Sequence, residues 1–258
     1  MLLGFPVVSI ANKEVDETRL TSKNIKSITI LTDHSLIVPL NLLARDYSRK
    51  QKMSVTTNIG DTPAHIAAIE LGAEANLVIT PKEQWIADLQ QKGLIDVYSR
   101  TPIAHNRIVL AGARTMMVPK SLNKDTSLRD LTQHPLEFMI NFGNPENNAE
   151  GGFGLSVLRR IGLLGQFEPH YHFFGSMYDM METLEAPEAI GFIYRSEALL
   201  FPNVRILQRF ERDIAPPVSY EAVVIAGENM EEAREFIIYL QSDYAQNIFK
   251  QYGFDTVF

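Results

Sequence analysis

Short apolar runs alternate with segments of helical periodicity along most of the chain. In the first third, each apolar run stops at a polar or glycine-containing junction, and apolar positions then recur every three to four residues. The runs that predict strands lie at 27–31, 55–59 and 76–80, and the periodic segments that predict helices lie at 36–47, 64–71 and 81–92. Strand and helix in strict alternation, with short connections, predict a parallel sheet covered by helices on both faces.

A second unit of the same kind follows and ends in a helical tail. Its predicted strands lie at 106–111, 137–141, 170–174, 190–194 and 220–226. Its predicted helices lie at 128–131, 154–161 and 177–184, and a helix pair is predicted at 230–250. We therefore expect two α/β lobes with a cleft between them. Ligands of open parallel sheets bind beyond the C-terminal ends of the strands, so the cleft is the expected site.

A glycine-rich stretch in the second unit is the strongest local signal. The apolar strand gives way to Asn141–Pro145 and then to Glu150–Gly154, and the helical pattern resumes at Leu155. Such a loop before a helix leaves backbone N–H groups pointing outward at the positive end of the helix dipole, where an anion can bind. An ordinary strand-to-helix turn is the alternative. Similar junctions at 32–35, 60–63 and 175–177 suggest that several helix N-termini converge on one cleft.

Composition narrows the function classes. The chain has 258 residues, 45% of them apolar, and a formal net charge of −7, which argues against a general nucleic-acid binder. It has no cysteine, which excludes disulfides, thiolate metal sites and a cysteine nucleophile. No phosphate-binding loop, dinucleotide fingerprint or zinc-protease motif is present, so no cofactor and no catalysis are expected.

The N-terminal segment reads as the end of an export signal. Residues 1–11 form a short apolar run that ends in Ser9-Ile10-Ala11, a small-x-small pattern, before a polar segment. The basic start of a secretory signal is missing, so an apolar tail without structure is the alternative. We predict an exported, periplasmic protein in which residues 1–25 are an export-signal remnant and a polar leader.

Three stretches resemble one family. The run 70–80, followed by Gln84-Trp85 and by 93–96, looks like the first lobe of periplasmic molybdate-binding proteins. The segment Gly191–Ala198 resembles a Gly-Ile-Val-Tyr-x-Ser-Asp-Ala segment of that family, and 248–254 is similar to its last helix and tail. The resemblance keeps the same order from about residue 27 to 254.

The resemblance implies a two-lobed type II periplasmic-binding-protein fold, with two crossing strands as the hinge near 106–111 and 218–226. Lobe one would comprise residues 26–107 and 219–258, and lobe two residues 108–218. The implied function is that of a monomeric solute-binding protein that delivers a small oxyanion of the molybdate or tungstate type to the membrane permease of an ABC importer.

The family holds its oxyanion with two hydroxyl groups, backbone amides and a tyrosine. By resemblance, the hydroxyls fall on Ser35 and Thr62, the amides near Glu150 and Met177, and the tyrosine on Tyr194. Hydroxyl and N–H donors at helix N-termini can stabilise a dianion without a buried counter-charge.

Three carboxylates depart from the family pattern at this site, namely Asp33, Asp61 and Glu150. Like charges a few ångströms apart repel by roughly 1–4 kcal/mol. Two hypotheses about these carboxylates therefore remain open. Either the carboxylates cap their own helices and point away, or the specificity has changed to a metal cation or an amine-bearing solute. A ligand sensor is a third possibility. The candidate ligands of the changed site are Asp33, His34, Asp61, His65, Glu150 and Tyr194.

Overall fold

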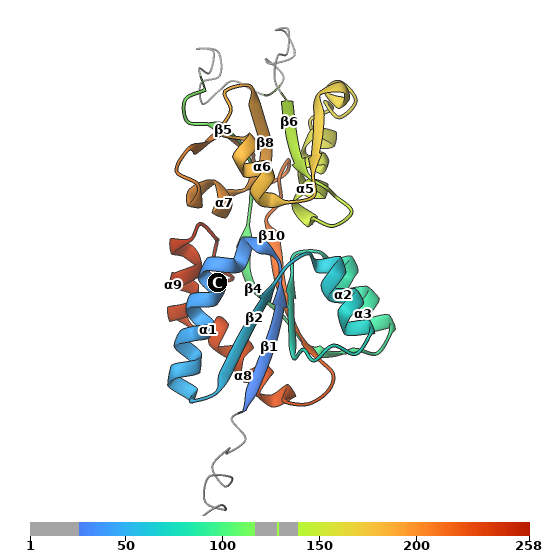
Figure 1. Ribbon diagram of the computed structural model, residues 1–258, viewed down its shortest axis with the longest axis vertical. Coiled ribbons are helices and arrows are strands. Elements are labelled where there is room, and N and C mark those ends of the chain that lie inside the picture. Colours follow the sequence, from blue (N-terminus) through green and yellow to red (C-terminus); the bar gives the residue numbers. More distant parts are fainter. Residues whose placement is uncertain (1–25, 117–127, 129–138) are drawn as a thin grey trace, which may run out of the picture.

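The computed structural model, which describes residues 26–116, 128 and 139–258, divides into two α/β lobes stacked end to end (Figure 1). Each lobe is built on a five-stranded sheet flanked by helices. The two-lobed α/β fold predicted from the sequence is confirmed. Residues 1–25, with the predicted export signal, lie outside the described part, as does most of the predicted helix at 128–131.

The first sheet has the strand order β2-β1-β3-β10-β4. Its strands are β1 (Ser27–Thr32), β2 (Ser54–Ile59), β3 (Leu77–Thr80), β4 (Ile95–Asn106) and β10 (Val218–Ile225). β1 runs parallel to β2 and β3, whereas β10 runs antiparallel to β3 and β4. All four residues of β3 are buried, as expected for a strand covered on both faces. The helices of this lobe are α1 (Ile37–Gln51), α2 (Thr62–Glu70), α3 (Glu83–Gln91), α8 (Met230–Leu240) and α9 (Asp243–Gln251).

The second sheet repeats this plan with the order β7-β6-β8-β5-β9. Its strands are β5 (Ile108–Ala113), β6 (Met139–Gly143), β7 (Tyr171–Phe174), β8 (Ala189–Tyr194) and β9 (Val204–Arg209). β6 is parallel to β7 and β8, and β5 is antiparallel to β8 and β9, so both sheets are mixed. The flanking helices are α5 (Ala149–Arg160), α6 (Met177–Thr183) and α7 (Arg195–Leu200).

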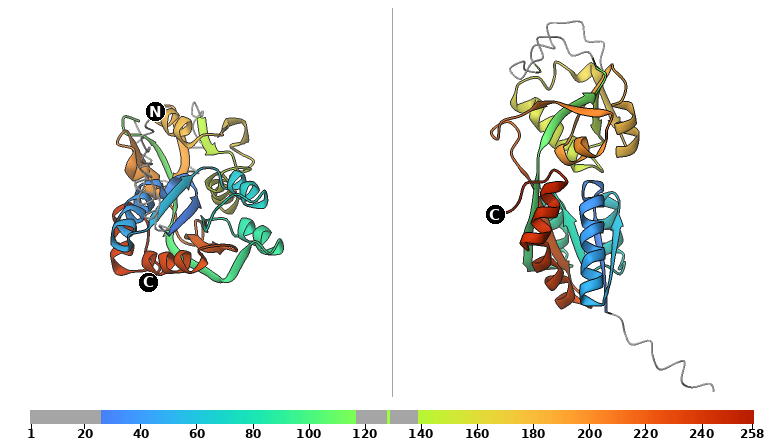
Figure 2. Two further views of the ribbon diagram at one scale, coloured as in Figure 1. Left: turned by 60° about the horizontal axis from the view of Figure 1, so that its bottom comes forward. Right: turned by 90° about the vertical axis from the view of Figure 1, so that its left-hand side faces the viewer.

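Two chain crossings join the lobes. A single residue, Arg107, separates β4 from β5, and residues 210–217 connect β9 back to β10. Figure 2 shows the two crossings passing between the stacked lobes. Asp255 of the C-terminal tail ties this region together, because its two carboxylate oxygens lie 2.7 Å from Arg107 Nε and 2.7 Å from Arg195 Nη2.

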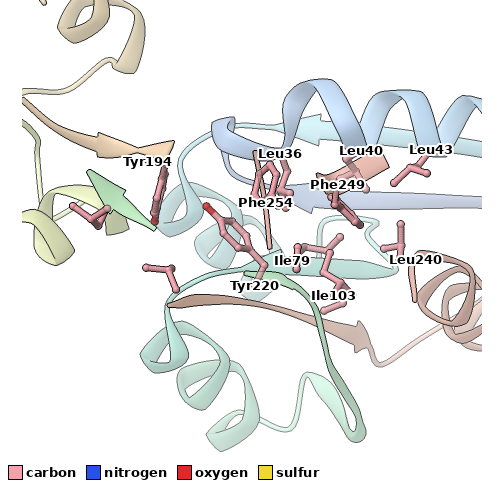
Figure 3. Packing of buried hydrophobic residues seen from close by; sticks show 14 of the residues in the cluster. Leu36, Leu40, Leu43, Ile79, Ile103, Tyr194, Tyr220, Leu240, Phe249 and Phe254 are labelled. Carbon is pink, nitrogen blue, oxygen red and sulfur yellow. The ribbon is translucent and has the colours of Figure 1, made fainter. Parts of the chain in front are cut away.

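A large apolar core fills the first lobe between its sheet and the helices α1, α8 and α9. Leucines of α1 and α8 pack against Ile79 and Ile103 of the sheet, and Phe249 and Phe254 close the core beside the hinge (Figure 3). Tyr220 and Tyr194 extend the buried cluster from the first lobe into the second. The hinge and the site are therefore held by well-packed elements of both lobes.

The glycine-rich stretch differs from its prediction. Asn148 is the N-cap of α5 and the helix begins at Ala149, so Glu150–Gly154 form its first turns instead of a loop. The glycines allow this helix to approach the sheet closely. A Cβ at Gly151 would lie 1.8 Å from the carbonyl oxygen of Gly143, and one at Gly154 would lie 2.7 Å from Cβ of Phe192.

Other elements were not predicted or have different bounds. β4, β9 and α7 were missed. The helix pair predicted at 230–250 is confirmed as α8 and α9, which divide at Ser242, the N-cap of α9. Among the described residues, no helix combines the length and the apolar character needed to cross a membrane.

Candidate functional site

A small cavity lies between the lobes, where the C-terminal ends of parallel strands from both sheets meet. Lobe one lines it with the residues that follow β1 and β2, which are Asp33, His34, Ser35, Gly60, Asp61 and Thr62. Lobe two lines it with residues around the start of α5 and the end of β8, which are Asn147, Asn148, Ala149, Glu150, Tyr194 and Glu197. The hollow has a volume of about 20 Å³, which is room for about one water molecule.

Ser35 is held in place by a carboxyl group and by a tyrosine. Asp33 is the N-cap of a short 3₁₀-helix (His34–Leu36), and its Oδ1 accepts hydrogen bonds from the Ser35 backbone N–H at 3.0 Å and from Ser35 Oγ at 2.5 Å. The same Ser35 Oγ lies 2.6 Å from the hydroxyl of Tyr220, which is fully buried. Asp33 therefore caps its own helix, but it also lines the cavity and does not point away.

Thr62 is the first residue of α2 and is 2% exposed. Its hydroxyl has no hydrogen-bond partner within the described protein, so it is free to bind a ligand. Asp61, the N-cap, makes no side-chain cap. Its Oδ1 lies instead 3.6 Å from His34 Nε2 at the partly exposed rim of the cavity. Asp61 therefore occupies the predicted N-cap position, but the expectation that its side chain caps α2 is wrong.

His65 does not face the cavity. It is 7% exposed, and its Nε2 lies 3.2 Å from the carbonyl oxygen of Thr32. Burial lowers the pKa of His65, which keeps the ring neutral. His65 is thus a packed residue of α2, close enough to Gly60 that a Cβ there would lie 3.3 Å from the imidazole.

The start of α5 brings a fully buried carboxyl group into the site. The backbone N–H of Glu150 donates to Asn148 Oδ1 at 2.9 Å, so the amide predicted for ligand binding is already bonded to its own N-cap. The Glu150 side chain is 0% exposed, and its Oε1 accepts the backbone N–H of Tyr194 at 2.5 Å. Its Oε2 has no hydrogen-bond donor within the described protein.

Tyr194 ends β8 and presents a buried hydroxyl to the cavity. The residue is 3% exposed, and no described group forms a hydrogen bond with this hydroxyl. The Tyr194 ring lies 6.0 Å from that of Tyr220, measured between centroids. Glu197, at the third position of α7, also accepts the Tyr194 backbone N–H, at 3.3 Å from its Oε2.

Three carboxyl groups of the cavity, those of Asp33, Glu150 and Glu197, are harder to ionise than usual. Burial raises the pKa of Asp33 to about 6 and that of Glu197 to about 7. Burial and the neighbouring Glu197 charge raise the pKa of Glu150 well above its usual value. Burial also raises the pKa of the Tyr194 and Tyr220 hydroxyls well above the ordinary range, so both are neutral hydrogen-bonding groups.

The positive field at the site comes from helix ends. The 3₁₀-helix and α2, α5 and α7 all begin at the cavity, with their N–H groups and dipoles directed toward it. Neither lysine nor arginine is among the residues found to line it in the described part of the chain. The cavity therefore combines oriented hydroxyl and amide dipoles with three carboxyl groups that tend to keep their protons.

Of the residues predicted to bind the oxyanion, all but Met177 line the cavity. Ser35, Thr62, Glu150 and Tyr194 line the one cavity. Met177, at the start of α6, does not; it packs in the apolar core of lobe two. Sequence reasoning missed Glu197 and Tyr220. The position of Glu197 three residues after Tyr194, at the start of a helix, was the available signal.

The alternative hypothesis of a metal site is not supported. In the described part of the chain, no group of three or more histidine and acidic side chains is arranged to hold a metal ion. Five of its six candidates line the cavity, with His34 and Asp61 at its rim, whereas His65 packs against the sheet.

Comparison with known proteins gives matches over nearly the whole chain. The family model described as "Bacterial extracellular solute-binding protein" matches residues 28–255. The molybdate-binding protein ModA of Escherichia coli (strain K12) is 24% identical over 231 residues, which is 88% of each chain. The molybdate-binding protein ModA of Haemophilus influenzae (strain ATCC 51907 / DSM 11121 / KW20 / Rd) is 21% identical over 232 residues, which is 89% of this chain and 90% of the relative. Among solved structures, the periplasmic molybdate-binding protein of Azotobacter vinelandii has a TM-score of 0.73 at 19% identity, covering 88% of this chain and 98% of the other.

Proposed function

The chain belongs to the family of bacterial extracellular solute-binding proteins, and on that premise we propose that it captures a small tetrahedral oxyanion of the molybdate or tungstate type. Capture takes place in the cavity between the lobes, on the outer side of the cytoplasmic membrane. The loaded protein delivers the anion to the permease of an ABC importer. The mechanism is binding and hinge closure, without a chemical step.

One observation carries the proposal: hydroxyl groups from both lobes meet at the N-termini of several helices. Ser35 and Thr62 come from lobe one and Tyr194 from lobe two, and all three line the same hollow. The hydroxyls of Thr62 and Tyr194 have no partner in the described part of the chain and can donate to a dianion, whereas that of Ser35 donates to Asp33 and supports the site. Such charge-assisted hydrogen bonds at helix N-termini need no buried cation. Because the donors come from both lobes, a bound anion favours the closed arrangement.

The size of the cavity supports a hinge mechanism. A hollow of about 20 Å³ accommodates about one water molecule, whereas a tetrahedral oxyanion carries four oxygen atoms. The lobes would therefore separate to admit the anion, and the bound form would be wider at the cavity than the form described here. The two crossings beside Arg107 and within 210–217 provide the place for this motion.

A thermal-shift panel tests the proposal. Molybdate, tungstate, sulfate and phosphate are compared with ferric, zinc, manganese and nickel ions, since a ligand at a hundred times its Kd stabilises by about 2.7 kcal/mol. We expect stabilisation by molybdate and tungstate and none by the metals. Stabilisation by metals alone would overturn the oxyanion proposal.

Thr62→Ala then tests the site itself. Loss of one hydrogen bond to a charged ligand costs about 1.5–3 kcal/mol, so the affinity for molybdate should fall roughly 10- to 150-fold. Thr80→Ala is the control, because Thr80 is equally buried in lobe one but does not line the cavity. If Thr62→Ala binds molybdate as tightly as Thr80→Ala does, Thr62 is not a ligand.

A further inference from the structure

Two carboxyl groups of the cavity compete for one hydrogen-bond donor. The backbone N–H of Tyr194 lies 2.5 Å from Glu150 Oε1 and 3.3 Å from Glu197 Oε2. The two side chains are 0% and 4% exposed, so water does not separate them. Two acid groups held at one N–H group are necessarily close to each other.

Among the described residues, neither lysine nor arginine lines the cavity beside this pair. From lobe one, Asp33 and the hydroxyl of Tyr220 face it, and from lobe two the hydroxyl of Tyr194 does, while His34 and Asp61 stand at the rim. Arg195, next to the pair in sequence, is turned away, with Nε on the carbonyl oxygen of Gly253 and Nη2 on Asp255. N–H groups and helix dipoles at the starts of α5 and α7 favour ionisation.

Ionising both carboxyl groups beside this N–H group is energetically unfavourable. Like charges about 4 Å apart repel by about 4 kcal/mol in the dielectric near a protein surface, and the pair therefore retains a proton. Burial raises the pKa of both groups, and the neighbouring Glu197 charge raises that of Glu150 further. The proton also provides the partner that Glu150 Oε2 otherwise lacks.

A separate observation indicates that a ligand belongs beside this pair. The hydroxyl of Tyr194 is buried and lines the same cavity, yet it has no hydrogen-bond partner within the described protein. Buried hydroxyl groups are nearly always bonded, since leaving one unpaired costs about 1–3 kcal/mol. A guest with acceptor oxygens would satisfy this hydroxyl and, at the same time, accept a hydrogen bond from a protonated carboxyl group.

We propose that Glu150 and Glu197 form a proton-donating pair that couples oxyanion capture to the uptake of a proton, so that this chain holds its anion more tightly at acid pH. This inference rests on the oxyanion function proposed above. The proton comes from bulk water and ends on a carboxylate oxygen of the pair, and the resulting O–H group donates to an oxygen of the anion. No bond of the anion forms or breaks.

The charges of the anion and of the acid pair determine whether the affinity rises or falls with pH. A dianion adds negative charge next to acid groups that titrate near neutral pH, with the pKa of Glu197 at about 7 before binding. The anion favours the protonated state, so binding draws in a proton wherever the pair was ionised in the free protein. If one proton is taken up per anion, the affinity falls about tenfold for each pH unit above about pH 7.

Titration calorimetry with molybdate tests the coupling. Affinities are measured from about pH 6 to 8, and at about pH 7.5 the heats are compared in two buffers of different ionisation enthalpy, which counts the protons exchanged. We expect uptake of up to one proton per anion and a falling affinity as the pH rises. The double variant Glu150→Gln, Glu197→Gln keeps neutral donors at every pH, so its affinity should be flat above about pH 7.

Glu221→Gln is the matched control, because Glu221 is a partly buried acid of lobe one that is bonded to Ser219 and does not line the cavity. It should keep the pH dependence of the unmodified protein. If the double variant fails to fold, the proton count on the unmodified protein still decides.

The outcomes separate the two proposals. Failure of molybdate, tungstate, sulfate and phosphate to bind at any pH would overturn the oxyanion function. Tight binding without proton uptake and with a flat pH profile would leave that function standing and refute the coupling. Release of a proton, with an affinity that rises with pH, would also refute it.

Discussion

Replacing Tyr194 with phenylalanine removes one oxygen atom from the cavity and should move affinity and stability in different directions. In the ligand-free protein the Tyr194 hydroxyl is buried without a described partner, so its removal breaks no hydrogen bond within the described protein. The ring remains packed against Tyr220. In the anion-bound protein the same hydroxyl is a proposed ligand, and its removal then deletes a charge-assisted bond.

The magnitudes follow from these two states. A hydrogen bond to a charged ligand contributes about 1.5–3 kcal/mol, so Tyr194→Phe should weaken molybdate binding roughly 10- to 150-fold. Relief of an unpaired buried hydroxyl should stabilise the free protein by up to about 1–3 kcal/mol. For a protein of this size each kcal/mol shifts Tm by about 2–4 °C, so the Tm of the free protein should not fall.

The assay pairs calorimetric Kd values with Tm values measured without ligand. Tyr171→Phe is the control, because the Tyr171 hydroxyl donates to the carbonyl oxygen of Leu164 at 2.5 Å and does not line the cavity. Its loss should lower the Tm by about 1–6 °C, for a bond that contributes about 0.5–1.5 kcal/mol, and leave the affinity unchanged.

Two results would refute the reasoning about Tyr194. An unchanged affinity for molybdate would show that the hydroxyl is not a ligand, whatever happens to the Tm. A clear fall in the Tm of the free protein would show that the hydroxyl already makes a stabilising bond without the anion.

Two further predictions concern stability. Gly151→Ala should destabilise the folded protein by several kcal/mol, because the new Cβ would lie 1.8 Å from the carbonyl oxygen of Gly143. Gly152→Ala should stabilise α5 by about 0.5–1 kcal/mol, because nothing lies within 4 Å of its Cβ. Urea unfolding measures both effects. Equal effects of the two variants would contradict the close packing of this helix on the sheet. The ligand-free protein should also lose stability as the pH rises from about 4.5 to about 7, because the folded state raises the pKa of Glu197 to about 7 and that of Asp33 to about 6 and so binds more protons than the unfolded chain. His65, whose pKa burial lowers, contributes in the opposite direction, so the comparison with Glu197→Gln is the test. Urea midpoints should fall less across this range in the variant, and an identical pH dependence would contradict the raised pKa of Glu197.

Most of the order of strands and helices could be predicted, because a buried parallel strand and an amphipathic helix have different periods. The apolar run 76–80 and the leucines that follow His34 are examples, and both correspond to observed elements. β4 was missed because it is an edge strand of 12 residues with a mixed burial pattern, to which no simple period applies.

The error at α5 has a physical cause. Glycine at 151, 152 and 154 suggests a loop if only backbone propensity is considered. In the fold, two of these glycines are needed where the helix axis approaches Gly143 and Phe192, and that approach depends on contacts between distant segments. A single sequence does not distinguish a glycine that loosens the backbone from one that lets a helix pack closely.

The acid groups at the site illustrate the same limit. That Asp33, Asp61 and Glu150 are near an anion pocket followed from the resemblance, but their directions did not. Asp61 lies at the rim with His34, whereas Glu150 turns fully inward. Glu197 was missed as a cavity residue because its partner, Glu150, is 44 residues from Tyr194, whose N–H both carboxyl groups accept.

The way the helix ends are satisfied determines which groups are left for a guest. The N–H of Ser35 is bonded to Asp33, that of Glu150 to Asn148 and that of Tyr194 to the two glutamates. An anion in this cavity would find these three amides already bonded, whereas the hydroxyls of Thr62 and Tyr194 have no partner in the part of the chain that the structure describes. Hydroxyl groups and protonated carboxyl groups must then take the place of these three amides in binding. Since the protonation of those carboxyl groups depends on pH, the affinity of this pocket for an anion depends on pH as well.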